Sequence, residues 1–333
     1  MEYCSLGTSG IQVSRLGFGG CPAGGHGWGG GVLETEAAIR AAMDAGVTLF
    51  DTADIYGLGQ SETIFGEVLR PVRQRAVIAT KFGVRRVDGR TVHDTRPAYI
   101  QEALEASLTR LKTDYVDLYQ LHYWDGETPL ADIQGTMADL IQAGKIRAWG
   151  VTNLDPLDLP RDMDGHMHGG PAPVSYSYQH NLVTPHDPAH LDRIHSTAQA
   201  SFLAWGSLAQ GALSGKYADD HSFGEDDRRA RDVYSAFHGA GLGKRRALLA
   251  AMRDAQTRHS GRSLAQIAIR WILQDRPESI ALAGIKTPKQ LDGLAGAFGW
   301  SLEPGDMALL SALAARPAES FAPAETRSED LVG

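Results

Sequence analysis

The chain has 333 residues, of which 43% are hydrophobic and 22% are charged, and this is the composition of an ordinary globular protein. A formal net charge of −8 and a pI near 5.8 argue against a nucleic-acid partner, because nucleic-acid affinity depends on positive charge. No apolar run reaches the roughly 18–20 residues of a membrane span, and the start MEYCSLGTSG lacks the features of a signal peptide, so we expect a cytoplasmic protein.

The first half of the chain alternates β-rich runs with helical patterns. Strands are expected at 12–19, 47–51, 76–80, 115–122 and 145–152, and helices at 33–46, 61–70, 97–111 and 129–144. Gly46 is expected to close the first helix, Ser61 to cap the second, and Pro97 to open the third.

The second half is less regular. Strands are expected at 172–179, 201–205 and 279–285, and helices at 189–199, 263–275, 287–297 and 303–315. A long polar stretch at about 206–243 is expected to be a loop over the substrate or cofactor, and 316–333 a frayed tail.

This order amounts to eight strand-then-helix units without a break in composition. Continuous alternation predicts a parallel sheet, and eight units favour a closed (β/α)₈ barrel, the TIM barrel, as a single domain over 1–333 with an N-terminal hairpin and a C-terminal helix. In such barrels the chemistry lies at the carboxyl ends of the strands.

Four polar residues stand at those ends. Asp51 and Tyr56 lie in FDTADIYG, Lys81 follows AVIAT, and His122 ends DLYQLH. Each has a structural alternative, such as an Asx turn for Asp51. Together, these residue types indicate acid-base chemistry on a carbonyl group, which needs a proton donor and a group that stabilises charge on the oxygen.

Gly25, Gly27 and Gly30 spell G-x-G-x-x-G, with Asp51 about 20 residues later, as in a dinucleotide-binding fold. The tract GGHGWGGG is so rich in glycine that a chance match is expected, and the next helical pattern begins only near Glu34. A flexible loop over a barrel mouth is the preferred interpretation.

Six segments in order resemble the aldo-keto reductase superfamily along almost the whole chain. They are FDTADIYGLGQSE, VIATKFG, DYVDLYQLH, GKIRAWGVTN, LAQGALSGKY and GIKTPKQL. The resemblance implies that Tyr56 is the general acid in reduction and the base in oxidation, and that His122 orients the substrate oxygen. It also implies that Lys81 lowers the pKa of Tyr56 and that Asp51 holds Lys81.

The resemblance implies NADPH or NADP⁺ as cofactor. Nicotinamide contacts would fall on Thr152, Asn153 and Gln179, with Trp205 standing where relatives usually have a stacking tyrosine. The pyrophosphate would be wrapped by Gly206, Ser207, Leu208, Gln210 and Lys216. In the segment from Gly284, Lys286 and Thr287 would face the 2′-phosphate and Gln290 the adenosine, which favours NADPH over NADH.

The chain departs from the family pattern after Gln290. Relatives often carry Glu-Asn three and four residues further on, where this chain has Gly293 and Leu294. An adenine contact would therefore be missing, which bears on cofactor affinity rather than on cofactor use.

Substrate residues and metal ligands have weaker signals. Aromatic residues on expected rim loops could form an apolar pocket: Trp28, Tyr123, Trp124, Tyr234 and Phe237. His180 could also touch substrate. His166 and His168 lack a completing ligand pattern, and Cys4 and Cys21 have no metal or disulfide spacing, so we predict no metal.

The leading prediction is a reductase of small-molecule aldehydes or ketones that also acts on alcohols in reverse. One alternative is a dehydrogenase acting oxidatively on a sugar- or pyridoxal-type alcohol. Another is a cofactor-binding regulatory subunit like those of potassium channels, which the acidic charge and the short N-terminus disfavour. The sequence carries no signal for oligomeric state.

Overall fold

The computed structural model describes residues 1–25, 27–28, 31–159, 170–276 and 278–321. The chain divides into two compact units. The barrel unit comprises Met1–Tyr178, Asp187–Trp205 and Glu278–Leu291, and the helical unit comprises Gln179–His186, Gly206–Pro277 and Asp292–Gly333. The single-domain expectation stays a prediction.

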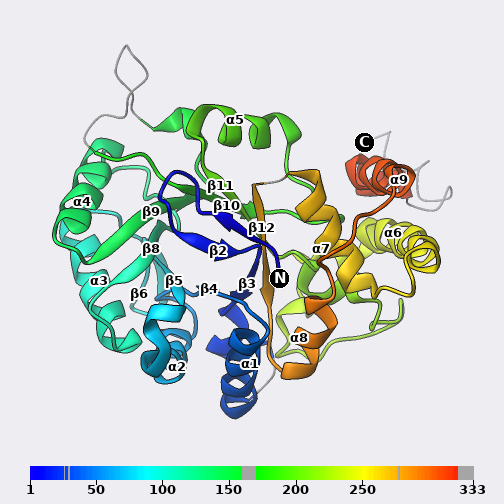
Figure 1. Cartoon of the computed structure of the whole chain (residues 1–333), viewed down its shortest axis with the longest axis horizontal. Coiled ribbons are helices and arrows are strands. Elements are labelled where there is room, and N and C mark those ends of the chain that lie inside the picture. The colour runs from blue at the N-terminus through cyan, green and yellow to red at the C-terminus, as the bar shows by residue number, and fades with distance from the viewer. Residues whose placement is uncertain (26, 29–30, 160–169, 277, 322–333) are drawn as a thin grey trace. The chain divides into compact units, whose positions relative to one another are not determined.

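Eight parallel strands close into a barrel (Figure 1). In chain order they are β3 (Leu16–Gly19), β4 (Leu49–Asp51), β5 (Val77–Phe82), β8 (Val116–Leu121), β9 (Ile146–Thr152), β10 (Ser175–Gln179), β11 (Ser201–Trp205) and β12 (Ser279–Gly284). The last strand pairs with the first, with Ala281 opposite Leu16. The predicted (β/α)₈ barrel is confirmed.

Helices follow the strands and lie outside them (Figure 1). They are α1 (Val32–Asp44), α2 (Gln60–Leu69), α3 (Pro97–Leu111), α4 (Leu130–Gln142) and α5 (Pro188–Ala198), and α8 (Pro288–Ala295) follows β12. In α3, Pro97 occupies the first turn as predicted, and Ile100, Leu104 and Leu108 are buried. The spacing of three and four residues places these side chains on one face toward the barrel.

An N-terminal hairpin packs against the barrel interior. It consists of β1 (Tyr3–Ser5) and β2 (Gln12–Ser14), which pair antiparallel, as predicted. Leu6 and Val13 join a buried cluster with strand residues such as Leu118 and Ile280. Burying side chains of this size stabilises the fold by roughly 1.5–3 kcal/mol each. The single strand expected at 12–19 is two strands in the structure, β2 in the hairpin and β3 in the barrel.

A second hairpin was not predicted. It is formed by β6 (Val84–Val87) and β7 (Arg90–His93), with Val84 opposite His93. Asp88 and Gly89 join the strands with φ of 48° and 76°. Two positive φ values suit the tight turn that Asp-Gly favours, so this dipeptide was the signal in the sequence.

The second helix does not begin as predicted. Its N-cap is Gly59, with a φ of 93°, rather than Ser61. The Ser61 hydroxyl is buried; it donates to the Gly20 carbonyl at 2.9 Å and accepts from the Thr52 hydroxyl at 2.7 Å. Ser61 thus joins the loops after β3 and β4 instead of capping α2.

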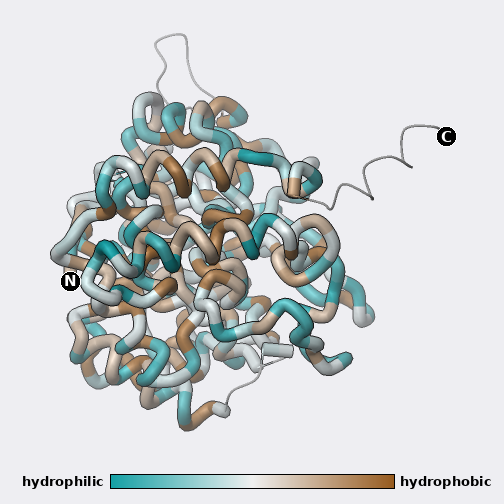
Figure 2. The backbone as a smooth tube through the Cα atoms, turned by 90° about the vertical axis from the view of Figure 1, so that its right-hand side faces the viewer, coloured by the Kyte–Doolittle hydropathy of each residue, from teal (hydrophilic) through white to brown (hydrophobic). Residues whose placement is uncertain are grey.

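The helical unit contains α6 (Gly239–Arg258), α7 (Leu264–Asp275) and α9 (Pro304–Ala315). Figure 2 colours the backbone by residue hydropathy and shows hydrophobic and hydrophilic residues alternating along the helices. Sequence reasoning missed α6 and ran the loop to 243. The helix begins with poor helix formers, Gly239 and Gly241, and buries two cations, Lys244 and Arg245, which interrupt the apolar period.

Polar contacts tie the helices of this unit together. The Lys244 ammonium donates to the Ala314 carbonyl at 2.6 Å, and His259 contacts the Asp306 carboxylate at 2.8 Å. Ser263 and Gln266 form a capping box at the start of α7. The rest of the chain before the tail contains short 3₁₀ turns: η1 (Cys21–Gly24), η2 (Arg70–Arg75), η3 (Pro156–Asp158), η4 (Ala209–Ser214), η5 (Arg228–Ala230) and η6 (Ser235–Phe237).

The expected tail begins with another such turn, η7 (Ala318–Phe321), and residues 322–333 lie outside the described part. Among the described residues, no helix combines the length and apolarity needed to cross a membrane.

Candidate active site

The four polar residues singled out in the sequence meet at one end of the barrel unit. Asp51 is the last residue of β4, and Lys81 is the penultimate residue of β5. His122 directly follows β8, and its amide donates to the Phe82 carbonyl at 2.9 Å. Tyr56 lies in the turn between β4 and α2. Parallel strands deliver their carboxyl ends to one rim, so the fold gathers these residues.

Asp51 and Lys81 form a buried ion pair. The Lys81 ammonium donates to both Asp51 carboxylate oxygens at 2.8 Å, and to the Thr52 carbonyl at 2.7 Å. The Gln120 side-chain amide donates to Asp51 at 3.2 Å. Gln120 was not predicted, although its place two residues before His122 on β8 puts both side chains on the same face of the strand.

Tyr56 lies between the ammonium and the imidazole. The Lys81 Nζ is 5.1 Å from the centroid of the Tyr56 ring, within the range of a cation–π contact. The His122 ring meets the Tyr56 ring edge-on, with centroids 5.8 Å apart and an interplanar angle of 87°. The Tyr56 phenol therefore lies within about 6 Å of both the Lys81 ammonium and the His122 imidazole, measured from the centre of its ring.

The environment keeps both rings neutral. Burial, and then the charges of Cys21 and Asp51, raise the pKa of Tyr56 well above its usual value. Burial is the largest of these effects, and the lowering of this pKa by Lys81 stays a prediction. Burial and the Lys81 charge lower the pKa of His122 to about 3. At neutral pH the phenol holds its proton and the imidazole is uncharged.

Asp54 is a carboxyl group near the tetrad that sequence reasoning did not single out. Burial, reinforced by the Glu62 charge, raises its pKa to about 7. Its Oδ1 has no hydrogen-bond partner among the described residues. Asp54 therefore changes its charge near neutral pH beside Tyr56, whose own pKa it helps to raise.

Two glycines allow the loops after β3 and β4 to approach each other closely. A Cβ at Gly24 would lie 2.6 Å from the Gly57 nitrogen, and a Cβ at Gly57 would lie 2.4 Å from the Gly24 oxygen. Gly57 also has a φ of 61°, so only glycine fits there. In the glycine-rich tract, the described residues Gly25, Gly27 and Trp28 lie outside helices and strands, as preferred, whereas Gly30 lies outside the described residues.

The predicted nicotinamide residues of the barrel unit lie at or after the ends of β9 and β11. Thr152 is buried, and its hydroxyl has no hydrogen-bond partner among the described residues. Asn153 has a φ of 57°, and its amide donates to the Ser177 carbonyl at 3.2 Å. Trp205 packs against the buried barrel cluster. An unpaired buried hydroxyl is a position that a polar ligand group can satisfy.

The segment after β12 carries the predicted phosphate residues. The Lys286 ammonium donates to the Trp28 carbonyl at 2.5 Å, and the Lys286 amide donates to the Gln290 side chain at 2.8 Å. The Gln290 amide donates to the Thr287 hydroxyl at 3.3 Å. At Gly284 a Cβ would lie 2.9 Å from the Pro22 ring. Lysine and threonine side chains here suit a phosphate group.

The remaining predicted cofactor residues belong to the helical unit. Ala209, Gln210 and Gly211 have φ values of 47°, 54° and 94°, a run of left-handed backbone that is strained for the first two residues. Such curved backbone often binds anions. A Cβ at Gly206 would lie 3.2 Å from the Gln210 amide and 3.7 Å from Gln179. Ser207 is buried, Leu208 accepts from the Gly211 amide at 2.9 Å, and Lys216 is exposed.

The predicted substrate residues divide into two groups. In the barrel unit, Tyr123 and Trp124 are 40% and 37% exposed, and Trp28 is half-buried. In the helical unit, Phe237 packs edge-on against Tyr217 and Phe223 inside the loop, and His180 is buried against Trp271. Tyr234 is half-buried. Packing thus accounts for Phe237 and His180 without a substrate.

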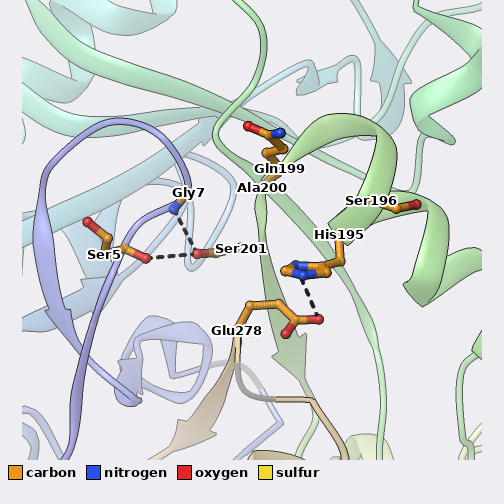
Figure 3. A pocket seen from close by; sticks show the side chains of 8 residues that line it. All are labelled: Ser5, Gly7, His195, Ser196, Gln199, Ala200, Ser201 and Glu278. Carbon is orange, nitrogen blue, oxygen red and sulfur yellow. Dashed lines mark hydrogen bonds and ion pairs between the residues drawn. The ribbon is translucent and has the colours of Figure 1, made fainter.

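A pocket of about 450 Å³ lies elsewhere on the barrel unit (Figure 3). Ser201 starts β11, and Glu278 precedes β12, so this pocket is at the amino ends of the strands. His195 stands 3.7 Å from Glu278, and the Ser201 hydroxyl accepts from the Gly7 amide at 2.8 Å. The amino end of a barrel contributes to stability rather than chemistry, so this pocket is not the candidate active site.

Metal ligands were not predicted. Within the described residues, no group of three or more His, Cys, Asp or Glu side chains is placed to hold an ion. His166 and His168 lie outside the described part of the chain.

Comparison with known proteins identifies the family. The model of the aldo/keto reductase family matches residues 15–315. The chain belongs to the aldo/keto reductase family. Aldo-keto reductase YhdN of Bacillus subtilis is 35% identical over 321 residues, covering 92% of this chain and 91% of that protein. The resemblance to the aldo-keto reductase superfamily seen in the sequence is thus confirmed.

Solved aldo/keto reductase structures share the fold. The glycerol dehydrogenase of Gluconobacter oxydans superposes with a TM-score of 0.82 and 31% identity, covering 95% of this chain and 96% of that one. An aldo/keto reductase of Klebsiella pneumoniae, solved with NADP and acetate, gives a TM-score of 0.71 and 25% identity, with 95% and 97% covered. Because the chain belongs to this family, it is an oxidoreductase.

Proposed function

We propose that this protein catalyses reversible, NADPH-dependent hydride transfer between the nicotinamide C4 and a small aldehyde or ketone, with Tyr56 as general acid and base. In the reverse direction the substrate is the corresponding alcohol. We further propose that it acts in the cytoplasm.

One observation carries the proposal: a neutral phenol lies between a neutral imidazole and an ammonium that is locked to a buried carboxylate. Reduction of a carbonyl needs a proton at the oxygen, and the high pKa of Tyr56 keeps that proton on the phenol until a stronger base forms. An alkoxide developing on the substrate is such a base.

The other side chains have distinct roles in this scheme. The neutral imidazole of His122 offers a hydrogen bond to the substrate oxygen without competing for the transferred proton. Lys81 stabilises the phenolate that is left when the proton departs, and Asp51 with Gln120 fixes Lys81 beneath the ring.

The cofactor supplies the hydride when it is bound. The unpaired Thr152 hydroxyl, with Asn153 and Gln179, would hold the carboxamide, and Trp205 would pack beside the ring. Gly206, Ser207, Leu208, Gln210 and Lys216 would hold the pyrophosphate. Lys286 and Thr287 support NADPH over NADH, because a lysine and a hydroxyl complement the 2′-phosphate. The NADP complex of the Klebsiella relative is consistent with this choice.

Replacement of Tyr56 by phenylalanine tests the proposal. The Tyr56→Phe variant should lose about 10²–10⁴-fold in kcat for NADPH oxidation with glyceraldehyde or benzaldehyde, while binding of NADPH, followed by fluorescence, stays within two- to three-fold of wild type. Turnover that persists within a few-fold of wild type rules out the proposed role of Tyr56.

A second candidate is oxidation of a polyol or a sugar- or pyridoxal-type alcohol. It is favoured by the similarity to the glycerol dehydrogenase of Gluconobacter oxydans. The same tetrad serves both directions, so the measurement that separates them is kcat/KM for glycerol with NADP⁺ and NAD⁺ against kcat/KM for glyceraldehyde with NADPH and NADH. A regulatory subunit would instead bind NADPH tightly with negligible turnover in every combination.

A further inference from the structure

We propose that His93 is a positioning residue for the reaction: its ring holds Tyr123, and Tyr123 in turn sets the orientation of His122. The inference rests on the proposed function for its kinetic consequence. Its structural part, the control of the His122 ring by His93, stands without it.

A continuous series of aromatic rings runs from the surface to Tyr56. The His93 and Tyr123 rings are nearly parallel, with an interplanar angle of 6° and centroids 5.2 Å apart. Tyr123 and His122 are 5.1 Å apart at 25°. His122 then meets Tyr56 edge-on at 5.8 Å. All three separations lie within the range of favourable aromatic pairs.

The ring of His122 contacts two aromatic rings, those of Tyr56 and Tyr123. Its Nδ1 is buried without a hydrogen-bond partner among the described residues, so no polar contact of that atom defines the rotation of the ring. We infer that the contacts with the Tyr56 and Tyr123 rings set this rotation. Tyr123 is 40% exposed, so it also needs a partner to stay in place.

The hairpin of β6 and β7 delivers that partner. It leaves the barrel at Gly83, directly after the strand of Lys81, and returns with His93 at the position opposite Val84. Gly83 has a φ of 102°, and a Cβ there would lie 2.6 Å from the Tyr123 carbonyl. The start of the hairpin is thus pressed against the backbone of the residue that His93 contacts.

The Asp125 carboxylate joins the segment after the hairpin to the loop that follows His122. Asp125 accepts from the Thr95 amide at 2.9 Å, just after the hairpin, and from the Thr128 amide at 2.8 Å within the loop that follows His122. Burial opposes ionisation of Asp125, but these hydrogen bonds outweigh it and lower its pKa. Asp94 adds ion pairs with Arg85 and Arg96 on the hairpin side. His93 is exposed, yet the elements on both sides of its contact are fixed.

The test compares two replacements of His93. The His93→Ala variant removes the ring, whereas His93→Phe keeps an aromatic ring and removes the titratable nitrogens. The control is Thr91→Ala, another exposed residue of β7. Kinetics use NADPH with benzaldehyde. A ring readout, the ¹H–¹³C signals of labelled histidines with His122 assigned by His122→Asn, does not depend on turnover.

We expect His93→Ala to shift the His122 ring signals and to lower kcat by about 2–10-fold, the loss of one aromatic pair, with the KM for NADPH unchanged. We expect His93→Phe to keep kcat within two-fold of wild type and the His122 ring signals at their wild-type positions. Thr91→Ala should change neither kcat nor the ring signals. An unmoved His122 signal in His93→Ala, or equal losses in both His93 variants, overturns the proposal. If the wild type shows no turnover, the proposed function fails, and the ring signals alone decide the role of His93.

Discussion

Lys81 places its ammonium 2.8 Å from both carboxylate oxygens of Asp51, and the two side chains are only 4% and 7% exposed. A charge buried this deeply is costly to leave alone, whereas the pair with its additional hydrogen bonds from Gln120 and to Thr52 is compensated. Removal of either partner would therefore leave the other charge buried without its counterion.

Breaking this pair from one side should destabilise the fold. We expect Asp51→Asn and Lys81→Met each to lower the free energy of unfolding by about 3–5 kcal/mol, because each leaves a buried charge unpaired. The double variant should lose less than the sum, with a coupling of about 0.5–3 kcal/mol in urea unfolding. Additive losses would show that the two charges act independently.

Asp54 should make stability depend on pH. The unfolded carboxyl ionises near pH 4, whereas the folded one keeps its proton until about pH 7, so the folded state binds more protons and stability falls as pH rises through this window. Asp54→Asn should match wild type near pH 4 and exceed it by about 1–3 kcal/mol at pH 8.

The matched control for Asp54 is Asp44→Asn, an exposed carboxyl on α1. Chemical unfolding at both pH values measures the difference. A parallel pH profile for wild type and Asp54→Asn would exclude the buried carboxyl as the cause.

Lys286 should decide the preference between phosphorylated and unphosphorylated cofactors. We expect Lys286→Ala to weaken NADPH binding by about 10–100-fold, the loss of a charge-assisted hydrogen bond, and to leave NADH binding almost unchanged. Lys289→Ala, on the exposed face of α8, is the control. Titration of cofactor fluorescence gives both affinities. An equal loss for NADPH and NADH would place the effect outside the 2′-phosphate.

Gly57 should tolerate no side chain. In Gly57→Ala the new methyl group would meet the Gly24 carbonyl at 2.4 Å, so the turn that carries Tyr56 must move, and we expect a loss of activity of at least ~10²-fold. Gly89→Ala is the control: its φ of 76° is also positive, but nothing lies within 4 Å, so it should cost about 1 kcal/mol in stability and leave turnover intact. Similar turnover in both variants would refute the steric argument.

The local pattern determined the regular elements of this chain. The apolar period of α3 was readable because each residue's role is set by neighbours three or four positions away. The ends of β4, β5 and β8 also marked Asp51, Lys81 and His122, since a polar residue that stops an apolar strand is visible without a structure.

Where distant segments meet, only the tertiary structure decided the outcome. Helix α6 buries Lys244 beside α9, and Ser61 bonds to the loop after β3 instead of capping its own helix. The high pKa of Tyr56, the contact of Gln120 with Asp51 and the stacking of His93 on Tyr123 depend on burial and distance between segments. Desolvation and contact between remote residues are properties of packing, so the sequence named the candidate groups while the fold set their environment and orientation.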